Sequence, residues 1–313
     1  MVRYFDGLPL DLLLSPWGLA LLGLAVGSFL NVVVHRLPLT LERQWWADVA
    51  AQLNDADSYR RVFAADAPER LKMAGGTVDK ALAEAPQLTL SRPASRCPAC
   101  GHRIRWFENI PVLSWLALRG KCSACGTRIG FRYPLVELST AAFFAAFAWQ
   151  MGPQPAALLW CGVAAALLAL ALIDWDTTVL PDAITLPLMW AGLCAAALGW
   201  LGPLTLLQSL QGAVVGYLAL WSVYWLFKLT TGKEGMGYGD FKLLAALGAW
   251  LGWQAILPIV LMASVLGAAV GLVMKATGSL RHGRFVPFGP FLAGGGVVVM
   301  LAGLPRVLGW IGW

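Results

Sequence analysis

The sequence GMGYGD, residues 235–240, closes a polar loop with the carboxylate of Asp240 and leads directly into the apolar run 243–253. Its three glycines allow other backbone segments to approach closely, because glycine has no side chain. An ionisable group placed against hydrocarbon is costly, so in a membrane protein it marks a candidate functional site. A second carboxylate in the same setting would make this stretch half of a site.

The composition indicates a membrane protein. Of the 313 residues, 58% are hydrophobic and only 13% are charged, which excludes a soluble globular domain of this length. We expect an all-α polytopic protein with about eight transmembrane helices, counted from apolar runs of membrane-spanning length. The run 243–253 is the sixth, and it is too short to cross a bilayer alone. The expected runs are 17–34, 134–149, 155–173, 183–200, 206–227, 243–253, 255–274 and 288–304.

The basic residues predict the orientation of these runs. With the amino terminus outside, the inner segments hold 21 Lys and Arg residues and the outer segments only Arg3 and Arg306. The positive-inside rule assigns the richer side to the cytoplasm. The net charge of +6 therefore reflects topology, and no nucleic-acid partner is expected. The start of the chain has no basic region followed by a cleavage site, so no removable signal peptide is expected.

The polar segment 37–132 is the one soluble module, and its second half contains two Cys-x-x-Cys pairs. Each pair is followed by a glycine, Gly101 or Gly126, that permits a tight turn. Two such turns supply tetrahedral sulfur ligation for zinc, against the alternative of unligated thiols. Four thiolates leave no open position for water, so the zinc is predicted to be structural. We expect His102 to lie at the surface or behind the ligands. The cysteines are Cys97, Cys100, Cys122 and Cys125.

Carboxylates also gather at the end of the third apolar run, at Asp174, Asp176 and Asp182. The stretch 174–182 contains no Lys or Arg to pair with them, so at least one is expected to have a function. Asp182 precedes an apolar run, and capping of the next helix is the preferred explanation for it. Asp240 has the same alternative, as an interfacial helix cap.

The first two apolar runs carry features that we interpret as packing and pairing. Glu137 stands one turn inside the second run, and we expect it to pair with Arg132 or another basic residue. Small residues recur in the first run at roughly helical spacing, which favours close helix packing over chemistry. They are Gly18, Gly23, Gly27 and Ser28.

Two aspartates at one membrane face suit an aspartyl protease. One carboxylate acts as general base on water, and the other, protonated, polarises the scissile carbonyl. Proximity of like charges and desolvation keep one proton on the pair.

The residues resemble a known family. The sequence Gly237-x-Gly239-Asp240 resembles the motif of intramembrane aspartyl proteases, and residues 174–182 resemble the other half of the type IV prepilin peptidase family. Further matches are GSFLNVV at 27–33, HRLP at 35–38, ENIP at 108–111, GKC at 120–122 and RYPLVE at 132–137. The resemblance covers nearly the whole chain. The exception is 45–89, which is longer than the family leads us to expect and to which we assign no role.

This resemblance implies a bifunctional enzyme of the bacterial inner membrane. Such enzymes remove the basic leader from type IV prepilins and type II secretion pseudopilins, then methylate the new amino terminus with S-adenosylmethionine. By motif position, Asp174 and Asp240 are the catalytic pair, supported by the loop glycines Gly237 and Gly239. A helix amino terminus favours negative charge and a carboxyl terminus disfavours it. We therefore expect Asp240 to be the ionised base and Asp174 the protonated partner.

Methyl transfer has no recognisable nucleotide-binding fingerprint. The zinc module is the only soluble element large enough for a cytoplasmic pocket, so we predict that it shapes the methyl-donor site with Glu108, Gly120 and Lys121. The predicted domains are 1–36, a first transmembrane helix; 37–132, the cytoplasmic module; and 133–313, a seven-helix peptidase core in the lipid bilayer.

Two other functions stay open at this point. One is a peptidase without methyltransferase activity, against which the intact cysteine module argues. The other, of a different class, is a transporter whose proton or cation path is lined by Asp174, Asp240 and Glu137. Clustering of the carboxylates at one interface and the lack of an inverted repeat argue against it.

Overall fold

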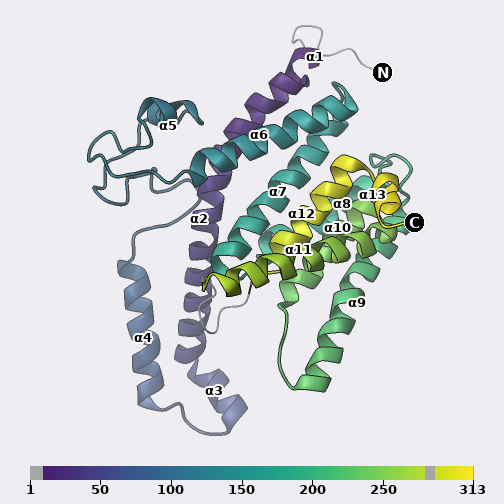
Figure 1. Cartoon of the computed structure of the whole chain (residues 1–313). Helices are drawn as coiled ribbons and strands as arrows, with labels where there is room; N and C mark the ends of the chain where they lie inside the picture. Colours follow the sequence, from purple (N-terminus) through teal and green to yellow (C-terminus); the bar gives the residue numbers. More distant parts are fainter. Residues whose placement is uncertain (1–9, 279–285, 313) are drawn as a thin grey trace. The chain divides into compact units, whose positions relative to one another are not determined.

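The structure is a computed structural model that describes residues 10–278 and 286–312, and every regular element within these ranges is helical (Figure 1). Arg3, Arg281 and Arg284, which entered the charge count above, lie outside the described residues. The elements are α1 (Leu10–Leu13), α2 (Pro16–Asn54), α3 (Ala56–Phe63), α4 (Glu69–Glu84), η1 (Trp106–Asn109), α5 (Leu113–Ala117), α6 (Arg132–Met151), α7 (Ala156–Thr177), α8 (Asp182–Ala197), α9 (Leu206–Thr231), α10 (Tyr238–Leu251), η2 (Trp253–Ala255), α11 (Ile256–Ala276), α12 (Gly289–Ala302) and α13 (Leu304–Trp310).

Several of these helices are long and apolar enough to cross a membrane. Four qualify within the described residues, namely α2, α7, α9 and η2 with α11, and the bent pair α12 and α13 makes a fifth if it counts as one span. The multi-pass, all-helical class is thereby confirmed. The predicted count of eight also needs α6, α8 and α10. Because α8 and α10 have only 16 and 14 residues, against the roughly 20 that span a bilayer, that count stays a prediction.

Contacts divide the chain into two compact units. The first comprises Met1–Leu30, described from Leu10 onward, with Pro111–Leu113 and Gly130–Trp313. The second comprises Asn31–Ile110 and Ser114–Ile129. The assignment of the short segment Pro111–Leu113 to the first unit was not foreseen from the sequence.

In the second unit, helix α2 continues well beyond the predicted first span. It runs for 39 residues with Pro38 inside it, so the polar residues after position 34 extend the helix instead of ending it. The rest of the insert 45–89 then forms the short helices α3 and α4. The Nδ2 group of Asn54 donates to Oδ2 of Asp79 at 2.7 Å, which ties α4 to the end of α2.

In the first unit, α10 is the most buried helix of the described residues. All its residues from Asp240 to Trp250 are buried except Lys242, and it packs against α9 and α8. A Cβ atom on Gly212 of α9 would overlap the carbonyl oxygen of Gly248 on α10, and the reverse holds as well. Backbones this close require glycine on both helices. The short sixth run therefore belongs to α10, a central packing element that begins within the glycine loop, residues 235–240.

The glycines of the first apolar run pack as predicted. A Cβ atom on Gly23 would lie 2.7 Å from Cα of Ala141, and one on Gly27 would lie 2.6 Å from Cα of Glu137. Both contacts are with α6, so small residues on α2 let these two helices approach closely.

Candidate active site and metal centre

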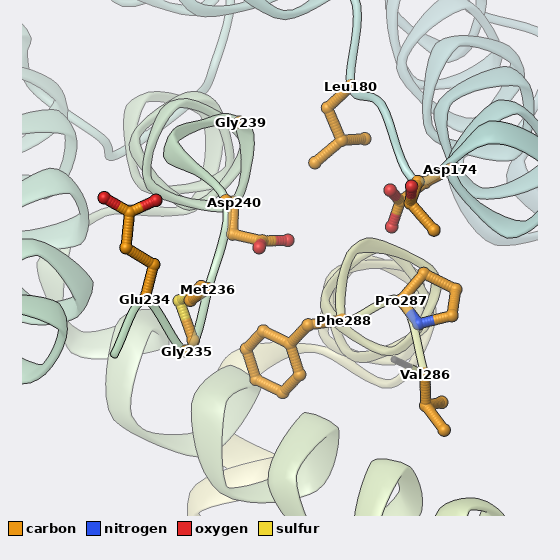
Figure 2. Close-up of a pocket in the computed structure, with 12 residues that line it drawn as sticks. Asp174, Leu180, Glu234, Gly235, Met236, Gly239, Asp240, Val286, Pro287 and Phe288 are labelled. Carbon is orange, nitrogen blue, oxygen red and sulfur yellow. The ribbon is translucent and has the colours of Figure 1, made fainter. Parts of the chain in front are cut away.

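Two buried carboxylates face one cavity in the first unit. Asp174 and Asp240 are only 5% and 7% exposed, and Figure 2 shows their side chains entering the cavity from different elements. The cavity has a volume of about 420 Å³. It is lined by Asp174, Thr178, Leu180, Glu234, Gly235, Met236, Gly237, Gly239, Asp240, Val286, Pro287 and Phe288. The structure thus brings together the two aspartates that were predicted as a pair, with both loop glycines beside them.

Asp174 lies in the last turn of α7. That helix ends at Thr178, whose left-handed conformation (φ 57°) directs its N–H to the carbonyl oxygen of Asp174 at 2.8 Å. The carboxylate points the other way, and its Oδ2 atom accepts a 3.0 Å hydrogen bond from the N–H of Gly289. Gly289 is the first residue of α12, so the donor to Asp174 is one of the N–H groups at a helix start that have no partner within the helix.

Asp240 lies in the first turn of α10, three residues after the N-cap residue Gly237. The backbone N–H of Gly237 is a hydrogen-bond donor to the carboxylate of Asp240, so the helix-cap explanation of Asp240 stays an alternative prediction beside the catalytic one. Its Oδ1 atom is buried and has no hydrogen-bond partner among the described residues. Buried oxygens without a donor are rare in folded proteins, and this one faces the cavity.

The surroundings of the pair do not separate the roles of the two carboxylates. A backbone N–H, which suits an ionised carboxylate, reaches both of them: that of Gly289 reaches Asp174 at 3.0 Å, and that of Gly237 reaches Asp240. The assignment of Asp240 as the base therefore stays a prediction, and we treat the proton as shared by the pair.

Leu180 fills the space between the two carboxylate-bearing helices and α12. A Cβ atom on Gly239 would lie 2.7 Å from Cβ of Leu180, and one on Gly289 would lie 3.2 Å from its Cδ1 atom and 2.6 Å from Oδ2 of Asp174. Both glycines are therefore required by close approach. Leu180, Gly289 and residues 286–288 were not predicted as site residues, although Gly289-Pro290 is a typical helix start.

Replacing Gly239 by Ala is expected to lower the rate of substrate turnover by about 10- to 100-fold, because a displacement on the order of 1 Å near reacting groups has an effect of that size. The matched control is Gly237→Ala. There the added Cβ atom would meet only Oδ2 of Asp240, at 3.9 Å, and the φ of −81° suits alanine. Turnover rates of the two variants provide the comparison, and equal losses would contradict this account.

The carboxylates next to Asp174 are paired with cations. Oδ1 and Oδ2 of Asp176 accept hydrogen bonds of 2.8 and 2.7 Å from the guanidinium of Arg132. Both oxygens of Asp182 accept 2.7 Å hydrogen bonds from Nζ of Lys242. Asp182 is the first residue of α8, after the N-cap residue Pro181, and its side chain makes no cap. The capping prediction for Asp182 is therefore wrong, because its carboxylate forms an ion pair with Lys242 of α10.

Glu137 forms no ion pair with Arg132, which binds Asp176, or with another basic residue of the described chain, so the pairing prediction is also wrong. It is 7% exposed, and its Oε2 atom accepts a 2.7 Å hydrogen bond from the N–H of Val112. Val112 has a φ of 58°, which is unusual for a β-branched residue. Glu137 thus holds the segment Pro111–Leu113 in the first unit.

The glycine loop is attached to α9 at both ends. At its start, Glu234 accepts a 2.8 Å hydrogen bond from Nζ of Lys228, which lowers the pKa of Glu234. At its end, the hydroxyl of Tyr238 lies 3.4 Å from that of Tyr224. Lys228 and Tyr224 are one helical turn apart and contact each other at 3.2 Å. None of these four residues was predicted, because the loop motif does not specify its neighbours.

The four predicted cysteines form one cluster in the second unit, with their sulfur atoms within 4.8 Å of one another. The Sγ atoms of Cys97 and Cys125 are 3.8 Å apart, which matches the roughly 3.8 Å between ligands in a tetrahedron with metal–sulfur bonds of about 2.3 Å. The hydroxyl and N–H of Thr127 lower the pKa of the Cys125 thiol to about 6. The cluster therefore fits a tetrahedral metal ion.

The two cysteine turns repeat one backbone pattern. Cys97 donates its N–H to the carbonyl of His102 and Cys122 donates its N–H to that of Thr127, both at 2.9 Å. Gly101 and Gly126 adopt φ values of 73° and 71°, as the predicted tight turns require. Each turn is closed by an isolated antiparallel bridge, Arg96 with Arg103 in one and Lys121 with Arg128 in the other.

Glu108 connects the two turns. Its Oε1 atom accepts from the hydroxyl of Ser123 at 2.6 Å, and its Oε2 atom accepts from the N–H of Arg105 at 2.8 Å and lies 3.2 Å from Nε2 of His102. These contacts, with the Arg105 N–H making the largest contribution, lower the pKa of Glu108 to about 2. His102 therefore lies behind the cysteines, as expected. Of the other predicted methyl-donor residues, Gly120 packs beside the Trp115 ring and Lys121 belongs to the second bridge.

Comparisons with known proteins agree with these features. The model of the bacterial peptidase A24 N-terminal domain matches residues 21–151, and that of the type IV leader peptidase family matches residues 161–272. The chain is 50% identical to a prepilin leader peptidase/N-methyltransferase of Burkholderia pseudomallei (strain 1026b), over 92% of this chain and 85% of that protein.

Proteins with the same name from two other organisms are similar. The Pseudomonas putida protein is 50% identical, over 90% of this chain and 88% of its own length. The Aeromonas hydrophila protein is 47% identical, over 90% of this chain and 89% of its own length. No solved structure matches the chain.

Proposed function

This chain belongs to the type IV leader peptidase family, and we propose that it cleaves the leader from type IV prepilins and then methylates the new amino terminus. The observation that carries the peptidase assignment is the pair Asp174 and Asp240. Both are buried, both line one cavity, and neither forms an ion pair among the described residues, although the adjacent Asp176 and Asp182 do. Two buried carboxylates without cations suit acid–base chemistry.

In the proposed cleavage step, water attacks the carbonyl carbon of the scissile peptide bond. The ionised carboxylate of the pair takes a proton from that water, while the protonated carboxyl donates a hydrogen bond to the carbonyl oxygen. When the C–N bond breaks, the leaving nitrogen takes a proton from the pair, which returns the pair to one shared proton. Apolar side chains, among them Leu180 and Phe288, also line the cavity, so it suits a substrate segment that enters from lipid.

The second proposed step is methylation of the amino group that cleavage releases. The unprotonated amine attacks the methyl group of S-adenosylmethionine, a C–N bond forms, the methyl–sulfur bond breaks, and the resulting ammonium releases a proton. We assign this step to the cysteine module, with Glu108, Gly120 and Lys121 shaping the donor site. Because both oxygens of Glu108 are taken by protein donors, its proposed contribution is to hold the two cysteine turns together.

We propose zinc as the metal of this module. Cys97, Cys100, Cys122 and Cys125 would supply all four ligands, and the ion would stabilise the fold without an open coordination position. The 3.8 Å separation of the Cys97 and Cys125 sulfurs supports a tetrahedral ion. Removal of the metal is then expected to unfold the module.

We further propose that the enzyme lies in the bacterial inner membrane with the aspartate pair and the cysteine module at the cytoplasmic face. The excess of basic residues in the segments on that side supports this orientation. Type II secretion pseudopilins, which share a leader and a following apolar segment with prepilins, are proposed as additional substrates.

The test is to incubate the purified full chain in lipid vesicles with a prepilin and S-adenosylmethionine, and to weigh the product. Loss of the leader mass followed by gain of one methyl group supports both activities. Loss of the leader without methylation indicates the peptidase alone. An uncleaved prepilin, together with proton or cation uptake into the vesicles, would support the transporter alternative and overturn the proposal.

A further inference from the structure

Each carboxylate of the pair has an ion-paired residue two positions further along its own helix. Asp174 is followed by Asp176, which binds Arg132, and Asp240 is followed by Lys242, which binds Asp182. Residues two apart on an α-helix point about 200° away from each other. In each helix, the carboxylate therefore faces the cavity, while the ion-paired residue points away from it and connects the helix to a neighbouring one.

Burial follows the same division. Asp174 and Asp240 are 5% and 7% exposed, whereas the side chains of Asp176 and Lys242 are 34% and 29% exposed. Both ion pairs have two hydrogen bonds of 2.7 or 2.8 Å. The two parallel bonds of Arg132 restrict orientation as well as distance, whereas Lys242 holds both oxygens of Asp182 through its single Nζ atom and fixes the distance.

Helix stability does not explain where two of these charges sit. An acidic residue is unfavourable in the last turn of a helix and a basic one in the first turn. Asp176 lies in the last turn of α7, and Arg132 begins α6. Two of the four charges, Asp176 and Arg132, are thus at the end that the helix dipole disfavours. Lys242 is the fifth residue of α10, beyond the first turn, and Asp182, at the start of α8, is at the favoured end.

The turns that carry the carboxylates need external restraint. Asp174 lies in the last turn of α7 and Asp240 in the first turn of α10, and the terminal turns of a helix lack half of their backbone hydrogen bonds. On α10, Gly239 is flush with Leu180. Lys242, three residues further on and therefore on the same face of the helix, binds Asp182 at the start of α8, directly after the linker that contains Leu180. The Arg132–Asp176 pair holds the end of α7 to the start of α6.

We propose that these two ion pairs are positioning devices, in which Arg132 and Lys242 fix the rotation of the helix ends that present Asp174 and Asp240 to one another. This inference rests on the proposed peptidase function. Exposed ion pairs contribute little to overall stability, whereas small displacements of reacting groups lower rates strongly. The pairs should therefore affect kcat far more than unfolding.

The experiment measures kcat, KM and the thermal unfolding midpoint of the full chain in lipid with a prepilin substrate. Lys242→Met, Asp182→Asn and Asp176→Asn are each expected to lower kcat by about 10- to 100-fold, with KM changed less than about 2-fold and little change in the midpoint. The charge-exchanged double variant Lys242→Asp with Asp182→Lys is expected to regain at least part of the lost kcat. Arg60→Met is the control, because Arg60 pairs with Asp66 in the insert, and its kcat should equal that of the wild type.

The neutral double variant Lys242→Met with Asp182→Asn separates position from electric field. It restores the local net charge but not the connection, so kcat should stay low, and a return to the wild-type value would overturn the proposal. Equal kcat for wild type and the single variants, with Asp240→Asn inactive in the same assay, would also overturn it. If the wild type itself does not cleave, the proposed function fails instead.

Discussion

Asp174→Asn and Asp240→Asn each abolish leader cleavage, with a loss of at least about 10³-fold in kcat, because loss of a group that acts as general acid or base has an effect of that order or greater. An amide has nearly the shape of a carboxylate but neither accepts a proton from water nor shares one with its partner. Both side chains are buried in one cavity, and Glu234, which also lines that cavity, is paired with Lys228, so it does not replace either one. Product mass after incubation with prepilin measures the loss.

Methylation provides the internal control for these variants. Both are expected to methylate a peptide that already begins at the mature amino terminus, because the proposed donor site lies in the cysteine module. Retention of methylation shows that the cysteine module of the variant protein is folded, and an unchanged thermal unfolding midpoint shows the same for the unit that holds the pair. Substantial leader cleavage by either variant would contradict the assignment of the pair.

Cys97→Ser is expected to remove methyltransferase activity together with the metal. A serine hydroxyl stays protonated at neutral pH, so it does not replace the thiolate, and three remaining sulfurs bind the ion less well. The two cysteine turns are otherwise joined mainly through Glu108, which accepts from Ser123 and Arg105 and lies beside His102. Loss of the metal should therefore disorder the module, while the aspartate pair in the other unit retains cleavage.

The matched control is Cys194→Ser. Cys194 is an exposed cysteine of α8 outside the cluster, so its replacement should leave metal content and methylation unchanged. Metal content measured by atomic emission and product mass measured in the same samples decide the result. Normal methylation by a metal-free Cys97→Ser protein would refute the structural role of the ion.

The class of the protein and the clustering of its four cysteines were predictable from local sequence. Apolar runs predict a helical membrane protein wherever they occur, because the bilayer requires backbone hydrogen bonds to be satisfied within each segment. The two cysteine turns depend on spacings of a few residues and on Gly101 and Gly126, which the structure shows with positive φ. The close packing of Gly23 and Gly27 against α6 followed from small-residue spacing for the same reason.

The helix limits were harder to predict, because burial within the bundle and exposure to lipid both select apolar residues. Helix α10 has the apolar composition of a span, yet its 14 residues are almost all buried between other helices. In contrast, α2 continues as a helix through residues that are too polar for a span. Hydropathy alone does not separate these cases.

Which charges have partners was decided only by the tertiary structure. Asp174, Asp176 and Asp182 look equivalent in sequence, and their neighbours offer no cation. Arg132 and Lys242 lie 44 and 60 residues away from the carboxylates they bind, so no local sequence pattern predicts these ion pairs. A carboxylate becomes reactive by being buried without a cation, and that depends on what the whole fold places beside it. Of the three carboxylates that line the cavity, Asp174 and Asp240 are the two that the described fold buries without a cation, whereas Glu234 binds Lys228.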